Sequence, residues 1–385
     1  MRPVIMSCFC LAVLLACTTE KPEVQVINPE PEIKIETISL DTLFVNLPAC
    51  SYVGEFGFEE DTIYFIDHLF CLVSTLDGEG NLGSVHLGKG NGPDELPGFS
   101  AFLGHTNGKP TFLSGDIIYQ FDSLWKNRVA KNIRWASRYT LREQSEKPNP
   151  KDPGIYEMRL PGMNDFLKVG DEYVIFAIES SHPEFNGLRY DQAKAYYENA
   201  GVFAKLNLTT GVVEEVLGRY PDLFKEQHIP NFAYAHTAFA KDTFFVSFEA
   251  SPLIEVYDKE FQKIAAFGNA GNQMQTDYPD YVGENNFERI EQNYAQEHSA
   301  YGYYADMAYF PNQNLLFRTY TQGSSGEEKR NPRRLQIYKQ KVLIGDVDVP
   351  DYFKVFGYSK GYFYADGFYD EANEKLAFYR FRLPL

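Results

Sequence analysis

Four short strand-like segments between positions 50 and 98 place the strongest constraint on how this chain can fold. Apolar, β-branched and aromatic residues fill 50–58, 62–67, 70–76 and 82–87, and the turns between them include Glu59-Glu60-Asp61 and Asp77-Gly78-Glu79-Gly80. These compositions are typical of strands and tight turns. Four such strands form an antiparallel meander, which cannot bury both of its faces alone. The fold therefore needs neighbouring sheets, and we expect the unit to recur.

The same unit does recur along the chain. The further strands expected from the pattern are 99–104, 111–114, 117–122 and 128–135, then 166–169, 173–178, 202–207 and 212–217, then 233–240, 243–248, 253–257 and 262–267, then 303–309, 315–321, 334–338 and 342–347, and last 354–358, 362–368 and 375–382. The sixth unit thus has three strands, while residues 33–40 alternate apolar and polar side chains without a local partner.

Pairing 33–40 with 375–382 completes the sixth unit and joins the two ends of the chain. The sequence therefore predicts an all-β fold, a six-bladed β-propeller closed by an N-terminal strand in the last blade. A two-domain β-sandwich is the alternative, but it does not explain why each unit has four strands.

The first 17 residues have the pattern of an export signal. Arg2 gives a positive start, residues 4–15 are mostly apolar, and Leu14-Leu15-Ala16-Cys17 ends in a cysteine. The apolar run is too short to span a bilayer. The tetrapeptide resembles the lipobox of bacterial lipoproteins, which implies that Cys17 is acylated; an ordinary secretory signal is the alternative. Thr18 resembles the residue found after the cysteine in lipoproteins sorted to the outer membrane.

Three parts are expected from these patterns. Residues 1–17 form the lipoprotein signal peptide, residues 18–32 form an extended tether without periodicity, and residues 33–385 form one propeller domain. We expect an outer membrane lipoprotein that faces the periplasm or the cell surface, attached to the membrane through its lipid anchor.

Charge and cysteine content narrow the possible partners. The net charge of −17 argues against binding nucleic acid, which requires a basic surface. After the signal and Cys17, two cysteines are left, Cys50 and Cys71. They fall on the first and third strands of one predicted sheet, about 9–10 Å apart, whereas a disulfide needs Cα atoms within about 7 Å. We expect two buried thiols; a bridge is the alternative.

Residues Gly88-Lys89-Gly90-Asn91-Gly92-Pro93-Asp94-Glu95-Leu96 follow the first unit. Together with the export cysteine and the tether, this stretch looks like the six-bladed, TolB-like or NHL-like propeller lipoproteins of Bacteroidetes, several of whose families have no known function. The resemblance covers nearly the whole mature chain and implies a fold but no activity. The glycine stretch lacks the Gly-Lys-Ser/Thr ending of a phosphate loop. We interpret it as a link between blades whose glycines permit positive φ.

Loop lengths differ between the two faces of the predicted disc. Strand direction alternates within a blade, so every long insertion (88–98, 136–155, 179–201, 218–231, 269–301 and 322–333) falls on one face, here called the long-loop face. Long loops on one side of a rigid scaffold are where binding usually resides. If strand 33–40 begins at the opposite, short-turn face, the tether leaves from there and the long-loop face is directed away from the membrane.

The insertion 269–301 carries the candidate ligand-binding residues. Residues 284–298 have helical spacing of Phe287, Ile290 and Tyr294, which predicts either a lid helix packed on the disc or a ligand platform. Tyrosine beside acidic residues and histidine offers flat apolar faces together with hydrogen-bonding groups. The candidates are Tyr278, Asp280, Tyr281, Tyr294, His298 and Tyr301.

No catalytic residue, metal site or cofactor is predicted. The seven histidines are scattered, without His-Glu-x-x-His or a Cys/His pair at metal spacing, and there is no Gly-x-Ser-x-Gly. Asp346 and Asp348 alternate on one strand and suit a cation, but a blade-end turn is the preferred interpretation. The sequence favours a non-enzymatic binding or scaffold protein that recognises a glycan, peptide or envelope protein on its long-loop face. An envelope hydrolase or lyase, with its site at the mouth of the central channel, is the alternative.

Overall fold

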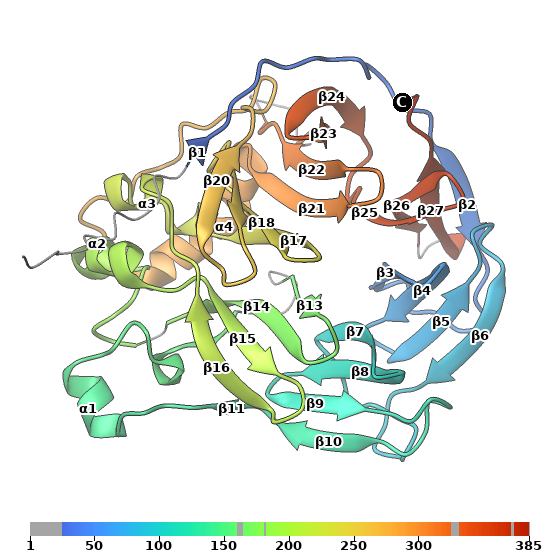
Figure 1. Cartoon of the computed structure of the whole chain (residues 1–385), viewed down its shortest axis with the longest axis horizontal. Helices are drawn as coiled ribbons and strands as arrows, with labels where there is room; N and C mark the ends of the chain where they lie inside the picture. The colour runs from blue at the N-terminus through green and yellow to red at the C-terminus, as the bar shows by residue number, and fades with distance from the viewer. Residues whose placement is uncertain (1–24, 160–164, 181, 325–330, 371–372, 385) are drawn as a thin grey trace, which may run out of the picture.

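The computed structural model describes residues 25–159, 165–180, 182–324, 331–370 and 373–384. Six antiparallel sheets are arranged in a ring around a central axis, with β27 at the end of the chain beside β2 at its beginning (Figure 1). The prediction of a six-bladed β-propeller closed by an N-terminal strand is confirmed.

The blades follow one another in chain order. Blade 1 contains β3 (Gly54–Glu59), β4 (Thr62–Asp67), β5 (Leu72–Leu76) and β6 (Leu82–Leu87); blade 2 contains β7 (Ala101–Thr106), β8 (Lys109–Ser114), β9 (Ile117–Gln120) and β10 (Val129–Asn132); blade 3 contains β13 (Leu167–Val169), β14 (Tyr173–Glu179), β15 (Phe203–Asn207) and β16 (Val212–Leu217). Blade 4 contains β17 (Ala235–Ala240), β18 (Thr243–Phe248), β19 (Ile254–Tyr257) and β20 (Lys263–Phe267); blade 5 contains β21 (Tyr304–Phe310), β22 (Leu315–Thr321), β23 (Arg333–Lys339) and β24 (Val342–Val349); blade 6 contains β25 (Val355–Ser359), β26 (Tyr362–Asp370), β27 (Lys375–Phe381) and β2 (Asp41–Val45).

The strand that closes the ring differs from the predicted one. β2, not 33–40, pairs antiparallel with β27, with Asp41 opposite Arg380 and Val45 opposite Leu376. Residues 33–40 instead pass along the outer edge of blade 5, where Ile35 forms a parallel bridge with Gly345 and its side chain is 1% exposed. Ile35 is thus buried on the rim although it belongs to no strand. A buried apolar residue between exposed polar ones gives the same alternation in the sequence as a half-buried strand.

The chain before β2 runs around the rim of the propeller. β1 (Gln25–Val26) lies parallel to β20 of blade 4, and from there the segment passes blade 5 to reach β2 (Figure 1). The inferred direction of the long-loop face relative to the membrane depended on strand 33–40 beginning at the short-turn face. That assignment was wrong, so the orientation drawn from it does not stand.

Short helices decorate the long-loop face. They are α1 (Leu141–Glu146), the 3₁₀ turn η1 (Pro153–Ile155), α2 (Tyr190–Asn199), α3 (Leu223–Glu226), the 3₁₀ turn η2 (Pro230–Phe232) and α4 (Phe287–Ala300). Each lies either between the second and third strands of a blade or in a link to the next blade, and both kinds of connection reach the same face. Two more short strands, β11 (Arg134–Trp135) and β12 (Glu157–Met158), pair with β16 and β14. The predicted asymmetry of the loops agrees with this arrangement.

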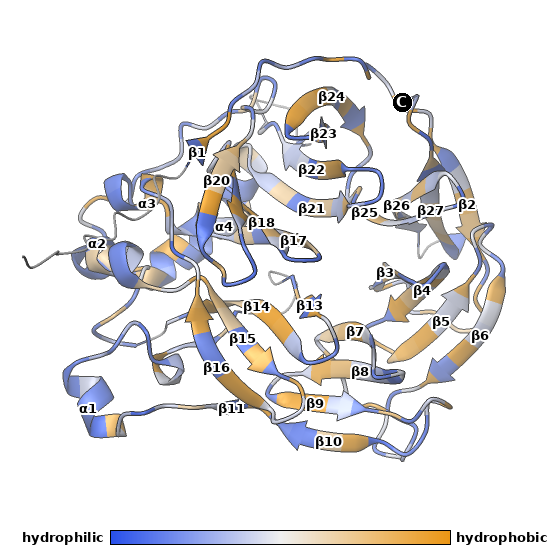
Figure 2. Cartoon of the chain, viewed as in Figure 1, coloured by the Kyte–Doolittle hydropathy of each residue, from blue (hydrophilic) through white to orange (hydrophobic). Residues whose placement is uncertain are grey.

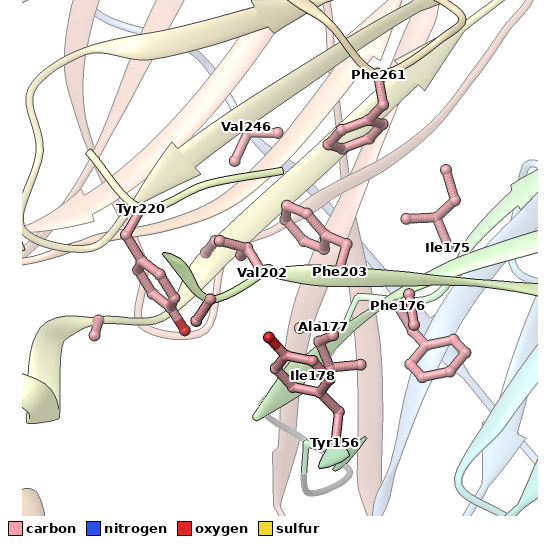
Figure 3. Close-up of a cluster of buried hydrophobic side chains, with 14 of the residues drawn as sticks. Tyr156, Ile175, Phe176, Ala177, Ile178, Val202, Phe203, Tyr220, Val246 and Phe261 are labelled. Atoms are coloured by element: carbon pink, nitrogen blue, oxygen red, sulfur yellow. The ribbon is translucent and has the colours of Figure 1, made fainter. Parts of the chain in front are cut away.

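The core is the set of apolar layers between neighbouring blades. Hydrophobic residues are concentrated on the strands, while the loops and the N-terminal segment are more hydrophilic (Figure 2). In the largest cluster, Phe203 of blade 3 packs edge-on against Phe261, and Phe176 is fully buried beside it (Figure 3). Removing such apolar surface from water contributes about 25 cal/mol per Å2. This contribution holds adjacent blades together. No helix among the described residues has the length and apolar character needed to cross a membrane.

Two smaller expectations can be compared with the structure. Cys50 and Cys71 are free thiols as predicted, but Cys50 is only half-buried because it lies in the link before β3. The glycine stretch is a link between blades, yet Gly88, Gly90 and Gly92 do not have positive φ. A side chain at Gly90 would instead meet the Glu95 carboxylate, which accepts a hydrogen bond from the Gly92 amide at 2.8 Å. Close approach of that carboxylate, not backbone handedness, explains the glycine.

Candidate functional site

The first strands of the six blades surround a central recess of about 510 Å3. Its lining extends from Glu55 at the beginning of β3 to Glu59 at the end of that strand, so the recess follows the length of these strands. Each first strand begins at the long-loop face, because it follows the link from the preceding blade. The recess and the long loops therefore share one face.

Five of the six blades place an ionisable side chain where the recess meets the long-loop face. These residues, called the mouth ring below, are Glu55, Asp165, His236, Asp306 and Lys354. Their side chains are between 19% and 45% exposed, so a ligand in solution can reach them. Blade 2 contributes the uncharged Ser100 and Ala101.

His236 is held between two carboxylates. Its Nδ1 lies 3.3 Å from Oδ2 of Asp165, and its Nε2 lies 3.7 Å from Oε1 of Glu249, which follows β18. Burial alone would lower the pKa of His236, but the neighbouring carboxylates of Asp165 and Glu249 outweigh burial and raise the pKa to about 10. The imidazole therefore carries a positive charge at neutral pH.

Lys354 supplies the second positive charge. Its Nζ lies 3.5 Å from Oδ1 of Asp306 and 3.8 Å from Oδ1 of Asp165. Burial opposes the ammonium, yet these two carboxylates hold the pKa of Lys354 above its usual range. The Arg333 guanidinium also pairs with Asp306. Although burial favours the neutral acid, Lys354 and Arg333 keep the pKa of Asp306 well below its usual range.

Asp165, His236 and Asp306 also have the spacing of a metal site, since one ligand atom from each lies within 4.8 Å of the others. A histidine must be neutral to ligate a metal, whereas Asp165 and Glu249 keep His236 protonated. Lys354 and Arg333 already balance the aspartates. The site itself therefore supplies three cations, Lys354, Arg333 and the His236 imidazolium, to balance its carboxylates.

The opposite end of the recess has its own polar cluster. The Glu59 carboxylate accepts hydrogen bonds from the His105 amide at 2.9 Å, from His105 Nδ1 at 2.7 Å and from Lys168 Nζ at 3.0 Å. These residues come from β3, β7 and β13, so they tie the first three blades together near the short-turn face.

The six residues singled out in the 269–301 insertion mostly anchor that insertion. Tyr278 and His298 both pack on Phe232 of η2, with ring centroids 4.3 and 4.8 Å away, and Tyr301 meets the same ring edge-on. Tyr294 lies on His298 at 4.0 Å. The predicted helix is present as α4. Its residue Ile290 is fully buried, while Phe287 at its start is 47% exposed.

The remaining two candidates make polar contacts within the same region. Tyr281 donates its hydroxyl hydrogen bond to Glu297 of α4, and Asp280 accepts one from the His228 amide at 3.1 Å. Of the six, His298 approaches the mouth ring: its Nε2 lies 3.1 Å from Oε2 of Glu249, whose other oxygen faces His236. The insertion thus supports the ring through His298.

Sequence reasoning missed the mouth ring, although a signal was present. Each of its residues stands near the start of a first strand: Asp165 and Lys354 just before it, Glu55 and His236 at its second residue, and Asp306 at its third. Comparing the blades position by position would have found this charged position. Asp346 and Asp348, which were considered for a cation, lie within β24 and both pair with Arg334.

No protein-family model and no curated protein matches the chain. Among solved structures, it is similar to a member of the DUF4221 family from Bacteroides vulgatus, with a TM-score of 0.64 and 14% identity over 92% of this chain and 99% of that one. It is also similar to a protein of Bacteroides fragilis that is named as exported, with a TM-score of 0.50 and 11% identity over 93% of this chain and 99% of that one. The fold is that of these Bacteroides proteins. At such identities the likeness shows the fold alone.

Proposed function

We propose that this protein is an outer membrane lipoprotein that binds a glycan or peptide through the mouth ring on its long-loop face. The observation that carries the proposal is the convergence of hydrogen-bonding groups of both signs on one recess of about 510 Å3, within the usual range of ligand pockets. Aromatic residues including Phe56, Phe166 and Phe356 line the same recess and offer apolar faces beside the charges.

Binding is favoured over proton transfer because the central charges are fixed. A general acid or base works best when its pKa lies near the working pH. The neighbours of His236 raise its pKa to about 10, and the pKa values of Asp165 and Asp306 are held below their usual range. Groups that keep their charge across the physiological range orient a ligand but do not exchange protons with it.

A glycan and peptide array tests the mouth ring. We expect residues 18–385 to bind a subset of the array, and Glu55→Gln or Lys354→Gln to weaken that binding at least tenfold because each removes a charge from the ring. Lys126→Gln, an exposed residue in a turn between β9 and β10, is the matched control and should bind normally. Binding that both ring variants retain would contradict the assignment of the site.

An envelope hydrolase or lyase is the second candidate, and Asp366 is the observation that favours it. Burial raises the pKa of this carboxyl to about 7, against the effect of Lys354 nearby, which is the range that suits a general acid. Release of products from an array ligand, lost on Asp366→Asn, would support the enzyme over the binding protein.

Export and lipidation are the second part of the proposal. Cys17 lies outside the described residues, so its support is the Leu14-Leu15-Ala16-Cys17 sequence together with the fold shared with a protein named as exported. In a Bacteroides host we expect the protein to incorporate a labelled fatty acid and to fractionate with the outer membrane. Cys17→Ser should abolish both; label that persists on Cys17→Ser would contradict acylation at this cysteine.

A further inference from the structure

A second pocket lies on the same face, between blades 6 and 1. It has a volume of about 590 Å3 and is built from the link before β3, the link before β25 and strand β26. Phe56 lines both this pocket and the central recess, so the two are neighbours. We call it the aromatic pocket.

Exposed aromatic rings dominate its wall. Tyr352 is 77% exposed, Tyr369 58% and Phe368 37%, and the aromatic lining also includes Tyr52, Tyr379, Phe56 and Phe65. A soluble protein seldom leaves several large rings exposed at one concave place unless the place binds something. The four tyrosines and Phe368 come from four separate segments, the links before β3 and β25 and the strands β26 and β27, so their convergence is a product of the fold and not of a local aromatic run.

The backbone of two of these tyrosines is unusual. Tyr52 has φ of 59° and Tyr352 has φ of 60°, in the left-handed region that bulky residues rarely adopt. Strained residues of this kind are concentrated at ligand-binding and active sites, where the surrounding structure holds them in place. Both occur in links between blades. Glycine would adopt this left-handed conformation without strain, so the link itself does not require a tyrosine. The left-handed backbone of these two tyrosines therefore costs folding stability.

The charges of the aromatic pocket indicate the kind of ligand. Asp351 and Asp366 are its ionisable residues other than tyrosine, and the lining includes no lysine, arginine or histidine among the described residues. A ligand with phosphate, sulfate or carboxylate groups would find no cationic side chain in this lining. Carboxylates and tyrosine hydroxyls, in contrast, accept hydrogen bonds from sugar hydroxyls, while aromatic rings cover the apolar faces of sugar rings.

We propose that the aromatic pocket is a separate binding site for the neutral sugar rings of an oligosaccharide, which pack on Tyr352 and Tyr369 and hydrogen-bond to Asp366. The volume also favours this ligand over a single quaternary ammonium group, which would leave most of 590 Å3 unfilled. The site does not depend on the mouth ring for its chemistry, so it stands or fails independently of the function proposed above.

Four neutral trisaccharides, cellotriose, maltotriose, mannotriose and triacetylchitotriose, are the probes for titration calorimetry and saturation-transfer NMR with residues 18–385. We expect at least one to bind, and Tyr352→Ala and Tyr369→Ala each to weaken it at least tenfold. Tyr139→Ala, a 43% exposed tyrosine near α1, is the matched control and should leave binding unchanged. Asp165→Asn, a mouth-ring change outside the lining of the aromatic pocket, should also leave it unchanged, which separates this site from the mouth ring.

Tyr352→Gly provides a second variant whose folding is secure, because glycine suits the left-handed backbone at this position. It should bind as weakly as Tyr352→Ala and melt at the same or a higher temperature than the wild type. Failure of all four trisaccharides to bind would overturn the proposal. So would binding that Tyr352→Ala and Tyr369→Ala leave unchanged, or saturable binding of choline at this pocket in place of the sugars.

Discussion

Replacing Arg318 by methionine is expected to destabilise the propeller by about 3 kcal/mol. Arg318 lies on β22 and its side chain is completely buried. It is placed where blades 4 and 5 meet, and it contacts both. A methionine keeps an unbranched apolar stem and removes the guanidinium, so the expected loss comes mainly from the contacts of that group.

The reason is that the Arg318 guanidinium donates to three acceptors at once, although Gln336 Oε1 and the Asn269 carbonyl also accept other hydrogen bonds. The guanidinium donates to Oε1 of Gln336 at 2.7 Å, to the carbonyl of Pro252 at 3.0 Å and to the carbonyl of Asn269 at 3.1 Å. Its Cζ also lies 3.8 Å from the centroid of the Tyr304 ring. Hydrogen bonds that involve a charged group contribute about 1.5–3 kcal/mol each, and a buried acceptor left without a donor costs about 1–3 kcal/mol.

Urea unfolding followed by circular dichroism measures this effect. Arg142→Met is the matched control, because Arg142 is 86% exposed and pairs with Glu146 on the surface of α1, where an ion pair contributes under about 1 kcal/mol. Arg318→Lys should fall between the wild type and Arg318→Met, since it keeps the charge but has fewer donors in a different geometry. A free energy of unfolding for Arg318→Met within about 0.5 kcal/mol of the wild type would contradict the prediction.

The fold was accessible from sequence because each blade is a local unit. In strand β4 the residues Ile63, Phe65 and Ile66 are buried, and this run of apolar residues predicts a central strand. The turn residues on either side mark its ends. Closure of the ring is a contact between the two ends of the chain, and no local pattern identifies it. Ile35 on the rim and Val45 in β2 are both buried apolar residues beside polar ones, so the sequence did not distinguish the closing strand from the segment before it.

The candidate site was harder to predict from the sequence, because it too depends on contacts between distant parts of the chain. His236, Asp165 and Lys354 come from blades 4, 3 and 6, and only the ring geometry brings them within ion-pair distance. A single charged residue at the start of a strand looks like an ordinary strand end when one blade is viewed alone. The tyrosines of the 269–301 insertion drew attention because they are adjacent in sequence, yet Tyr278 and Tyr294 mainly pack the insertion against η2 and within itself.

Replacing Asp366 by asparagine is expected to stabilise the protein at pH 8 and to have little effect near pH 4. Burial raises the pKa of Asp366, Lys354 lowers it, and the negative charge of Glu55 raises it again, so that it stands at about 7 in place of 3.8. Between these two values the folded protein holds a proton that the unfolded chain has lost. The free energy of unfolding therefore falls as the pH rises from about 4 to about 7 and changes no further from this group above that.

Asparagine removes this titration and retains an oxygen for the hydrogen bond that the Phe56 amide donates to Oδ1 of Asp366 at 3.2 Å. One pKa unit corresponds to about 1.4 kcal/mol, so Asp366→Asn should exceed the wild type by on the order of 2–4 kcal/mol at pH 8. Urea unfolding of both proteins at pH 4.5, 6 and 8 measures the difference.

Glu55→Gln is the control with the opposite sign. Burial would raise the pKa of Glu55, but His68 and Lys354 lower it below its usual value, so its ionised form stabilises the folded protein at neutral pH. Glu55→Gln should lose stability at pH 8 where Asp366→Asn gains it. A difference between Asp366→Asn and the wild type that stays constant from pH 4.5 to 8 would show that Asp366 titrates like an ordinary exposed carboxyl.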